Sequence, residues 1–121
     1  MPVTDHARCL VFKIAVRGEW EDACRSGVFL GSRDDVRDGY IHMSTGPQLA
    51  GTAEKHFRGQ NNLLLIAYDA QSLGPNLRWE TSRGGALFPH VYAGLLVTAA
   101  LWVHPLQLGA GGVPEIPVGI F

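Results

Sequence analysis

Apolar runs of strand length recur along this chain and are separated by short polar segments. Residues 9–15 form one run that only Lys13 interrupts, and residues 63–68 form a second that is apolar throughout. Branched and aromatic residues in runs of this length predict buried strands. The continuous run at 63–68 predicts a central strand with both faces covered. Further strands are predicted over 40–43, 77–80 and 96–103.

Two short helices are predicted between these strands. Over residues 19–26, Trp20, Ala23 and Cys24 share one face at helical spacing, and Gly27 follows as a stop. A second helix is predicted over residues 47–57. Thr45 and Gln48 before it fit a capping box, and Pro47 suits the first turn.

The remaining segments are polar or rich in glycine and proline. Residues 31–39 predict a loop in which Asp34 and Asp35 are solvated. Residues 105–121 predict an extended tail that is only partly ordered. No repeat or boundary is visible, so residues 1–121 predict a single domain. Strands outnumber helices and the connections are irregular, which predicts the α+β class.

Composition and charge narrow the range of partners. The fraction of hydrophobic residues is 46% and the net charge is −1, with ten basic and eleven acidic residues interspersed. This balance argues against an extended nucleic-acid surface. The longest apolar run, residues 93–103, is too short for a membrane span. Cys9 and Cys24 predict small buried thiols rather than a disulfide framework. With no signal-peptide core, we expect a cytoplasmic protein without a membrane partner.

Two segments carry the candidate chemistry. Residues 78–92 bring together a glutamate, arginines, a Gly-Gly pair, a histidine and aromatics, and residues 38–45 place a histidine and two hydroxyls in an apolar run. In an alternating strand, Tyr40, His42 and Ser44 share one face and Ile41 and Met43 take the other. Polar groups in apolar surroundings need partners, so the two segments together predict a site.

The residues of these segments resemble a bacterial family of unknown function, domain-of-unknown-function family 952. The resemblance covers about residues 9–104 and rests on two motifs, Asp-Gly-aromatic-Ile-His-x-Ser at 38–44 and Glu-x-Ser-Arg-Gly-Gly-x-x-Phe-Pro-His-x-Tyr at 80–92. It implies an ADP-ribosyltransferase-like fold, a split β-sheet core with two short helices. The superfamily with that fold includes enzymes that use NAD, so NAD is the cofactor that the resemblance suggests.

The superfamily pattern assigns roles to residues of this chain. A first-strand polar residue that binds ribose falls at Lys13, where a histidine is more usual. A late carboxylate that stabilises the ribose falls at Glu80. The predicted catalytic residues are Glu80, His42 and His90. The predicted ligand-binding residues are Lys13, Tyr40, Ser44, Thr45, Arg83, Gly84, Gly85 and Tyr92. No metal site is predicted, since a set of two histidines and Glu80 has no supporting short-range spacing.

Each of these residues also has a purely structural interpretation. A buried neutral histidine bonded to backbone explains His42 or His90 taken singly, and an ion pair with an arginine explains Glu80. Two functions therefore stay open. One is an enzyme acting on a nucleotide, NAD-related, or on a phosphorylated small molecule, with Arg83 holding an anion. The alternative is a non-catalytic module that binds a small ligand in the same pocket. The sequence leaves the oligomeric state open.

Overall fold

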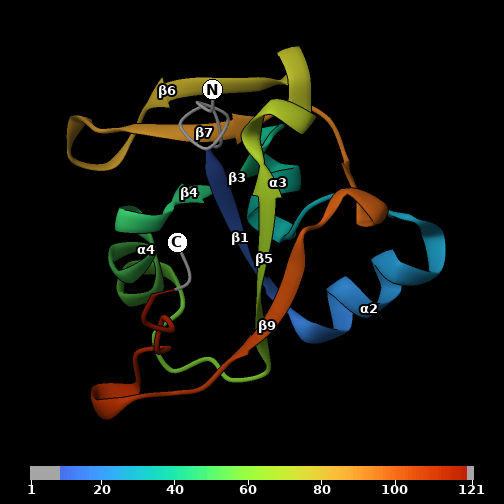
Figure 1. Ribbon diagram of the computed structural model, residues 1–121. Coiled ribbons are helices and arrows are strands. Elements are labelled where there is room, and N and C mark those ends of the chain that lie inside the picture. The colour runs from blue at the N-terminus through green and yellow to red at the C-terminus, as the bar shows by residue number, and fades with distance from the viewer. Residues whose placement is uncertain (1–8, 120–121) are drawn as a thin grey trace, which may run out of the picture.

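The computed structural model describes residues 9–119, apart from the side chain of Arg83. This part of the chain is α+β, with three antiparallel sheets and three α-helices (Figure 1). The helices are α2 (Arg17–Ser26), α3 (Arg33–Asp38) and α4 (Leu49–His56). The strands are β1 (Leu10–Val16), β2 (Val28–Phe29), β3 (Ile41–His42), β4 (Ser44–Thr45), β5 (Leu63–Asp69), β6 (Leu77–Thr81), β7 (Leu87–Val91), β8 (Leu95–Leu96) and β9 (Trp102–Leu106). The predicted class is confirmed, with α3 in addition to the two predicted helices.

The largest sheet is built around β5. Its strand order is β4-β1-β5-β9, and β1 and β5 pair along seven residues from Leu10↔Asp69 to Val16↔Leu63. All the residues from Leu63 to Tyr68 are buried, as the continuous apolar run predicts. β4 pairs with β1 only at Val11 and Phe12 in the observed ladder, so the rest of that β1 edge faces other elements.

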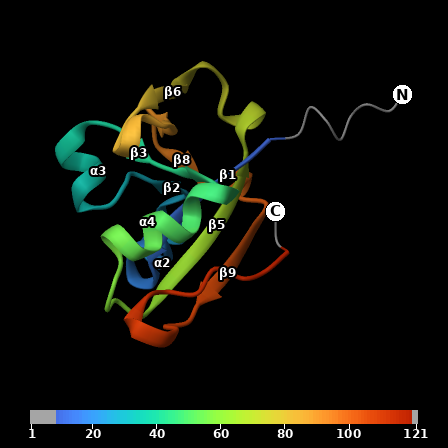
Figure 2. The same cartoon turned by 90° about the vertical axis from the view of Figure 1, so that its left-hand side faces the viewer.

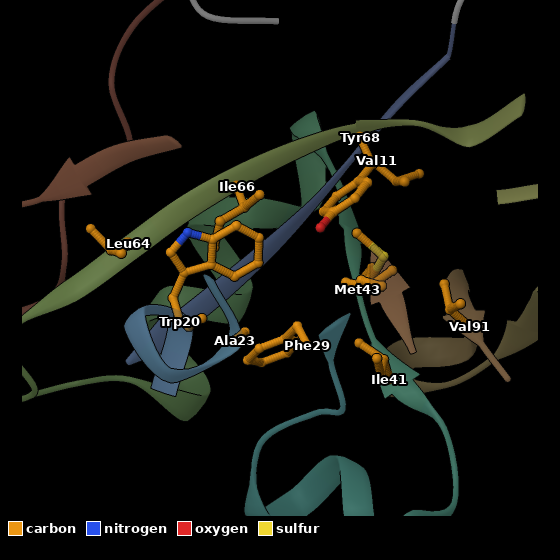
Figure 3. Close-up of a cluster of buried hydrophobic side chains, with 12 residues drawn as sticks. Val11, Trp20, Ala23, Phe29, Ile41, Met43, Leu64, Ile66, Tyr68 and Val91 are labelled. Carbon is orange, nitrogen blue, oxygen red and sulfur yellow. The ribbon is translucent and has the colours of Figure 1, made fainter. Parts of the chain in front are cut away.

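Alternate residues of the central strands pack into two separate apolar clusters. Leu64, Ile66 and Tyr68 join Trp20 and other residues in one cluster, which Figure 3 shows beneath β5. The intervening residues of β5 join a second cluster that includes Leu49. Because Trp20 lies on α2 and Leu49 on α4, the two helices cover opposite faces of the sheet, as seen in Figure 1.

A second sheet crosses one end of the first and positions the candidate site. Its order is β3-β7-β6, and it lies at the top of the view in Figure 1. The pairing of β3 with β7 sets His42 directly opposite His90, and the pairing of β7 with β6 sets His90 opposite Arg78. Pairing of β2 with β8 forms the third sheet, with Phe29 opposite Leu95. In Figure 2, α3 lies beside β3 at the left of the molecule.

The predicted loop over residues 31–39 is wrong, because α3 occupies most of it. Ser32 is the N-cap, and its side chain accepts from the Asp35 backbone while the Asp35 carboxylate accepts from the Ser32 N–H. This reciprocal pair is a capping box with aspartate at the third helical position. Asp35 is 2% exposed rather than solvated.

The predictions for the last strand and the cysteines also need correction. The predicted strand over 96–103 is divided into β8, a 3-10 turn over Val97–Ala99, and β9. β9 continues through Pro105, which an edge strand tolerates because its other side needs no N–H donor. Cys9 and Cys24 are both exposed.

The segment after β9 is not simply extended. Leu108 and Pro114 form an antiparallel bridge around a 3-10 turn over Ala110–Gly112. Ile116 packs against the cluster on the α4 face. Within residues 9–119, the helices are all too short or too polar to cross a membrane.

Candidate functional site

Both candidate segments contribute to one pocket, of about 280 Å³, beside the edge of β1 that β4 leaves open. Its size is close to the lower end of the range for small-molecule sites. The wall combines apolar, acidic, basic and imidazole side chains from β1, α3, β3, β4, α4 and β7. The lining residues are Phe12, Lys13, Ile14, Ser32, Asp34, Asp35, Arg37, Asp38, Tyr40, His42, Met43, Ser44, Thr52, His56, Phe57, Ser82, Phe88 and His90.

A buried ion pair forms one wall of this pocket. The Nζ of Lys13 lies 2.7 Å from Oδ2 of Asp35 and donates to the carbonyl oxygen of His42 at 3.0 Å. The side chains of Lys13 and Asp35 are 5% and 1% exposed. The neighbours of Lys13 on β1 are apolar and buried, whereas the ammonium group of Lys13 contacts a carboxylate from α3.

Asp35 connects three segments of the chain through its two carboxylate oxygens. Its Oδ1 accepts from the backbone N–H of His42 at 3.0 Å and lies 2.6 Å from His42 Nδ1, while Oδ2 accepts from Ser32. Gly31 allows the carboxylate side chain to lie this close, because a Cβ at Gly31 would be 2.7 Å from Cβ of Asp35. The carboxylate thus fixes α3 and β3 relative to Lys13.

The protonation of this pair follows from its surroundings. Burial alone would raise the pKa of Asp35, but the His42 hydrogen bonds and the charge of Lys13 outweigh it and hold that pKa well below its usual range. Burial lowers the pKa of Lys13, and the Asp35 carboxylate opposes that shift. At neutral pH Asp35 is ionised, so its contact with His42 is a hydrogen bond donated by Nδ1–H.

The second histidine has its own carboxylate. His90 Nδ1 lies 2.7 Å from Oε1 of Glu80, and the hydroxyl of Tyr92 donates to the same oxygen at 2.8 Å. These bonds lower the pKa of Glu80, and the hydrogen bond from His90 has the largest effect. The guanidinium of Arg78 lies over the ring of Tyr92, 5.0 Å from its centroid. Glu80 therefore stays ionised and orients His90, which is 3% exposed.

The ring of Tyr40 covers both histidines. Its centroid is 4.2 Å from that of His90 in a stacked arrangement, 4.6 Å from His42 and 5.2 Å from Tyr92. The two imidazole centroids are 5.6 Å apart. The aromatic cluster therefore holds the imidazoles of two strands against one side of the pocket.

The other nitrogen of His42 meets a third carboxylate. Nε2 of His42 lies 3.0 Å from Oδ2 of Asp38, the last residue of α3. Asp38 also accepts from Arg37, whose Nε is 2.8 Å from Oδ1. The Arg37 hydrogen bond lowers the pKa of Asp38, and the charge of His42 adds to that effect. His42 thus lies between the carboxylates of Asp35 and Asp38.

The structure brings some of the predicted site residues together and places others behind or beside the pocket. Those that line it are Lys13, Tyr40, His42, Ser44 and His90. Glu80 and Tyr92 are not among the described lining residues, but Glu80 bonds to His90 and Tyr92 donates to Glu80. The backbone N–H of Thr45 donates to Oε1 of Gln48, and Gly84 and Gly85 belong to a 3-10 turn; these three are not among the described lining residues. The predicted anion-binding side chain of Arg83 lies outside the described residues.

The acidic side of the pocket was not predicted from the sequence. Asp35 and Asp38 are the partners of His42, yet their segment was predicted to be a loop. The spacing of Ser32 and Asp35 is a signal for the start of α3, since it is the same capping pattern that Thr45 and Gln48 show, but it does not indicate that the aspartates contact His42. Within residues 9–119, no group of three or more histidine, cysteine, aspartate or glutamate residues is placed to hold a metal ion.

Comparison with known proteins finds a family model and solved structures that are similar to this chain. The family model described as "Protein of unknown function (DUF952)" matches residues 14–103. The crystal structure of protein CC0527 from Caulobacter crescentus is 51% identical, with a TM-score of 0.86 over 88% of this chain and 93% of that one. The solution NMR structure of CC0527 is also 51% identical, with a TM-score of 0.79 over 88% and 91% of the two chains. The curated proteins contain no match to this chain.

Proposed function

We propose a function from the pocket itself, because this chain belongs to DUF952, a family of proteins of unknown function. The proposal is an enzyme that acts on a nucleotide or a phosphorylated small molecule, with NAD-related nucleotides as the first candidates. His42 and His90 are the acid–base groups in this proposal, and Glu80 acts on the reaction by orienting His90.

One observation carries the proposal: two histidines line one pocket, and each donates its Nδ1–H to a carboxylate. Asp35 holds His42 at 2.6 Å, and Glu80 holds His90 at 2.7 Å. A carboxylate at Nδ1 fixes the ring orientation and stabilises the imidazolium that forms when Nε2 takes up a proton. Two such rings in one pocket suit a reaction in which one group accepts a proton and another donates one.

The ADP-ribosyltransferase-like fold is part of this proposal. Its support is the division of the strands into separate antiparallel sheets, with the pocket lined by residues of both β1 and β7. In this scheme a nucleotide ring packs against Tyr40, which lines the pocket and is half-buried. Arg83 is the residue proposed to hold a phosphate.

A non-catalytic binding module is the second candidate, and a different observation favours it. The ionisable groups of the pocket satisfy one another, as in the contact of His42 Nε2 with Asp38. Among the described residues that are not exposed, every buried side-chain nitrogen and oxygen has a hydrogen-bond partner. Pairing keeps each of these polar groups in one protonation state. Such a pocket can bind a ligand, but it offers no group that is activated for proton transfer.

A ligand screen followed by a turnover test separates the two candidates. The purified protein is screened by thermal shift against NAD, nucleotides and phosphorylated metabolites, and each ligand that stabilises it is then incubated and analysed by mass spectrometry. The enzyme proposal predicts that wild-type protein and His104→Gln convert the ligand, whereas His42→Gln does not. His104 is the matched control because it is an exposed histidine on β9. A ligand returned unchanged supports the binding module, and a screen without any stabilising ligand overturns both candidates.

A further inference from the structure

The charged groups at the His42 end of the pocket leave no unpaired Lys or Arg cation among the described lining residues. Three carboxylates, Asp34, Asp35 and Asp38, stand beside two such cations, Lys13 and Arg37. Lys13 is 2.7 Å from Asp35, and Arg37 lies 2.8 Å from Asp38 and 3.4 Å from Asp34. Each of these two cations already faces a carboxylate, and His42 faces Asp35 and Asp38 with its two ring nitrogens. A ligand anion entering this end would therefore have to displace a carboxylate before it could reach a cation.

The contact between Asp38 and His42 defines which chemical groups fit here. An incoming phosphate or carboxylate needs the Nε2–H donor that Asp38 already faces at 3.0 Å. A hydroxyl differs because it carries both a donor and an acceptor. It can accept from His42 Nε2 while donating to Asp38, so it joins the pair without leaving either group unsatisfied.

The aromatic neighbour adds an independent observation. The ring of Tyr40 lies beside His42, with 4.6 Å between the centroids, and lines the same pocket. A sugar presents hydroxyls on its edge and C–H groups on its faces. The arrangement of a carboxylate, an imidazole and an adjoining phenol ring matches both surfaces, because Asp38 and His42 meet the hydroxyls while Tyr40 meets the C–H face.

We infer that the His42 end of the pocket is a subsite for an uncharged polyol, such as the vicinal hydroxyls of a sugar, and that Asp38 makes it reject phosphate. Ribose recognition by a carboxylate follows the same chemistry in dinucleotide-binding folds. The inference rests on the proposed function, in that it names which part of a nucleotide lies against His42. A phosphate then binds away from α3.

Two probes test the inference without any nucleotide. Isotope-labelled protein is titrated with D-ribose and, separately, with inorganic phosphate, and the NMR signals of the His42 ring are followed. Wild-type protein should show a saturable shift with D-ribose and none with phosphate. Asp38→Asn should bind D-ribose about tenfold more weakly, the size of one lost charge-assisted hydrogen bond. The same variant should gain a phosphate response, because it removes the carboxylate that faces Nε2.

Asp22→Asn is the matched control, since Asp22 is an exposed carboxylate on α2 that pairs with Arg25 and is not among the described lining residues of the pocket. It should respond to both probes as the wild type does. Two results overturn the inference: phosphate shifting His42 equally in wild type and Asp38→Asn, or D-ribose leaving wild-type His42 unshifted. Neither result depends on turnover of a nucleotide, so a failure of the proposed function is seen separately in the ligand screen.

Discussion

His42 and His90 lie directly opposite each other in the pairing of β3 with β7, yet different parts of the chain hold them. Asp35 of α3 bonds to His42, and Glu80 of β6 bonds to His90. Because the supports are separate, each ring can be perturbed without removing the partner of the other.

The buried ion pair should dominate the stability of the site. Lys13→Met leaves the Asp35 charge buried without its cation, and removing one member of a buried pair typically costs about 3–5 kcal/mol. The double variant Lys13→Met/Asp35→Asn should lose less than the sum of the two single variants, because no unpaired charge remains. Urea unfolding of the three variants measures these free energies.

An exposed ion pair provides the control for that experiment. Arg58 lies 3.3 Å from Glu54 on the surface of α4 and the following turn, and Arg58→Met should cost no more than about 1 kcal/mol. Equal losses for Lys13→Met and Arg58→Met would show that the buried pair has no special weight.

Stability should fall in acid through Asp35. The folded-state pKa of Asp35 is held well below the unfolded value of about 3.9, so its ionised form favours the folded state. That contribution is fully present above the unfolded pKa and is lost as the pH falls below about 4. Urea unfolding at a series of pH values should show a steeper acid loss for wild type than for Asp35→Asn. Parallel curves for the two proteins would contradict the assignment.

Glu80→Gln should impair turnover more than folding. The substitution keeps the shape of the side chain but removes the charge that stabilises protonated His90, and general acid–base groups contribute roughly 10²–10⁴-fold to rate. Once a substrate is known, the measurement is the rate constant of Glu80→Gln compared with that of the wild type, and circular dichroism checks the fold.

Tyr92→Phe is the control for Glu80, since it removes the other donor to the same oxygen and leaves the charge in place. Its rate should change by less than about tenfold, the effect of one hydrogen bond. Near-normal turnover by Glu80→Gln would remove Glu80 from the mechanism. An unfolded variant would make it a structural partner of His90.

Gly39→Ala tests the turn that positions Tyr40 against His42 and His90. Gly39 ends α3 with φ 86° and ψ 11°, a left-handed conformation that costs an alanine roughly 1–2 kcal/mol. Gly18→Ala is the control, because Gly18 lies in α2 with open space around an added Cβ. This substitution should raise the free energy of unfolding by up to about 1 kcal/mol. Thermal unfolding should move the two midpoints in opposite directions, and a shift in the same direction would exclude the strain argument.

The strands that are marked by the order of apolar and polar residues were predictable from the sequence. The apolar run at 63–68 specified the central strand. The alternation placed Tyr40, His42 and Ser44 at the pocket and Ile41 in the core, but Met43, which belongs to the same core cluster as Ile41, also lines the pocket. These predictions succeed because burial depends on local order along a strand.

The acidic partners of His42 were not predictable in the same way. Asp35 lies in a segment whose composition resembles a solvated loop, and its burial as a charged group depends on Lys13, which is distant in sequence and pairs with it in one wall of the pocket. β9 was misplaced for a related reason, since Pro105 is acceptable only at the edge of a sheet and the edge is set by the order of strands. Contacts of this kind between distant segments produce no repeating pattern of apolar and polar residues in the sequence.

The pairing of β1 with β5 also governs the order in which the molecule can assemble. Leu10 pairs with Asp69 and Val16 with Leu63, so the central ladder closes a loop that contains α2, α3 and α4. Contacts between residues so distant in sequence require the loop between them to close, which costs conformational entropy and slows folding. Lys13 lies on β1 and Asp35 lies inside this loop, so their ion pair is one of the contacts that the central ladder encloses. A nascent chain that ends before Leu63 therefore contains Lys13, Asp35 and His42 but lacks both β5 and the strand that carries His90, so it cannot form the complete pocket.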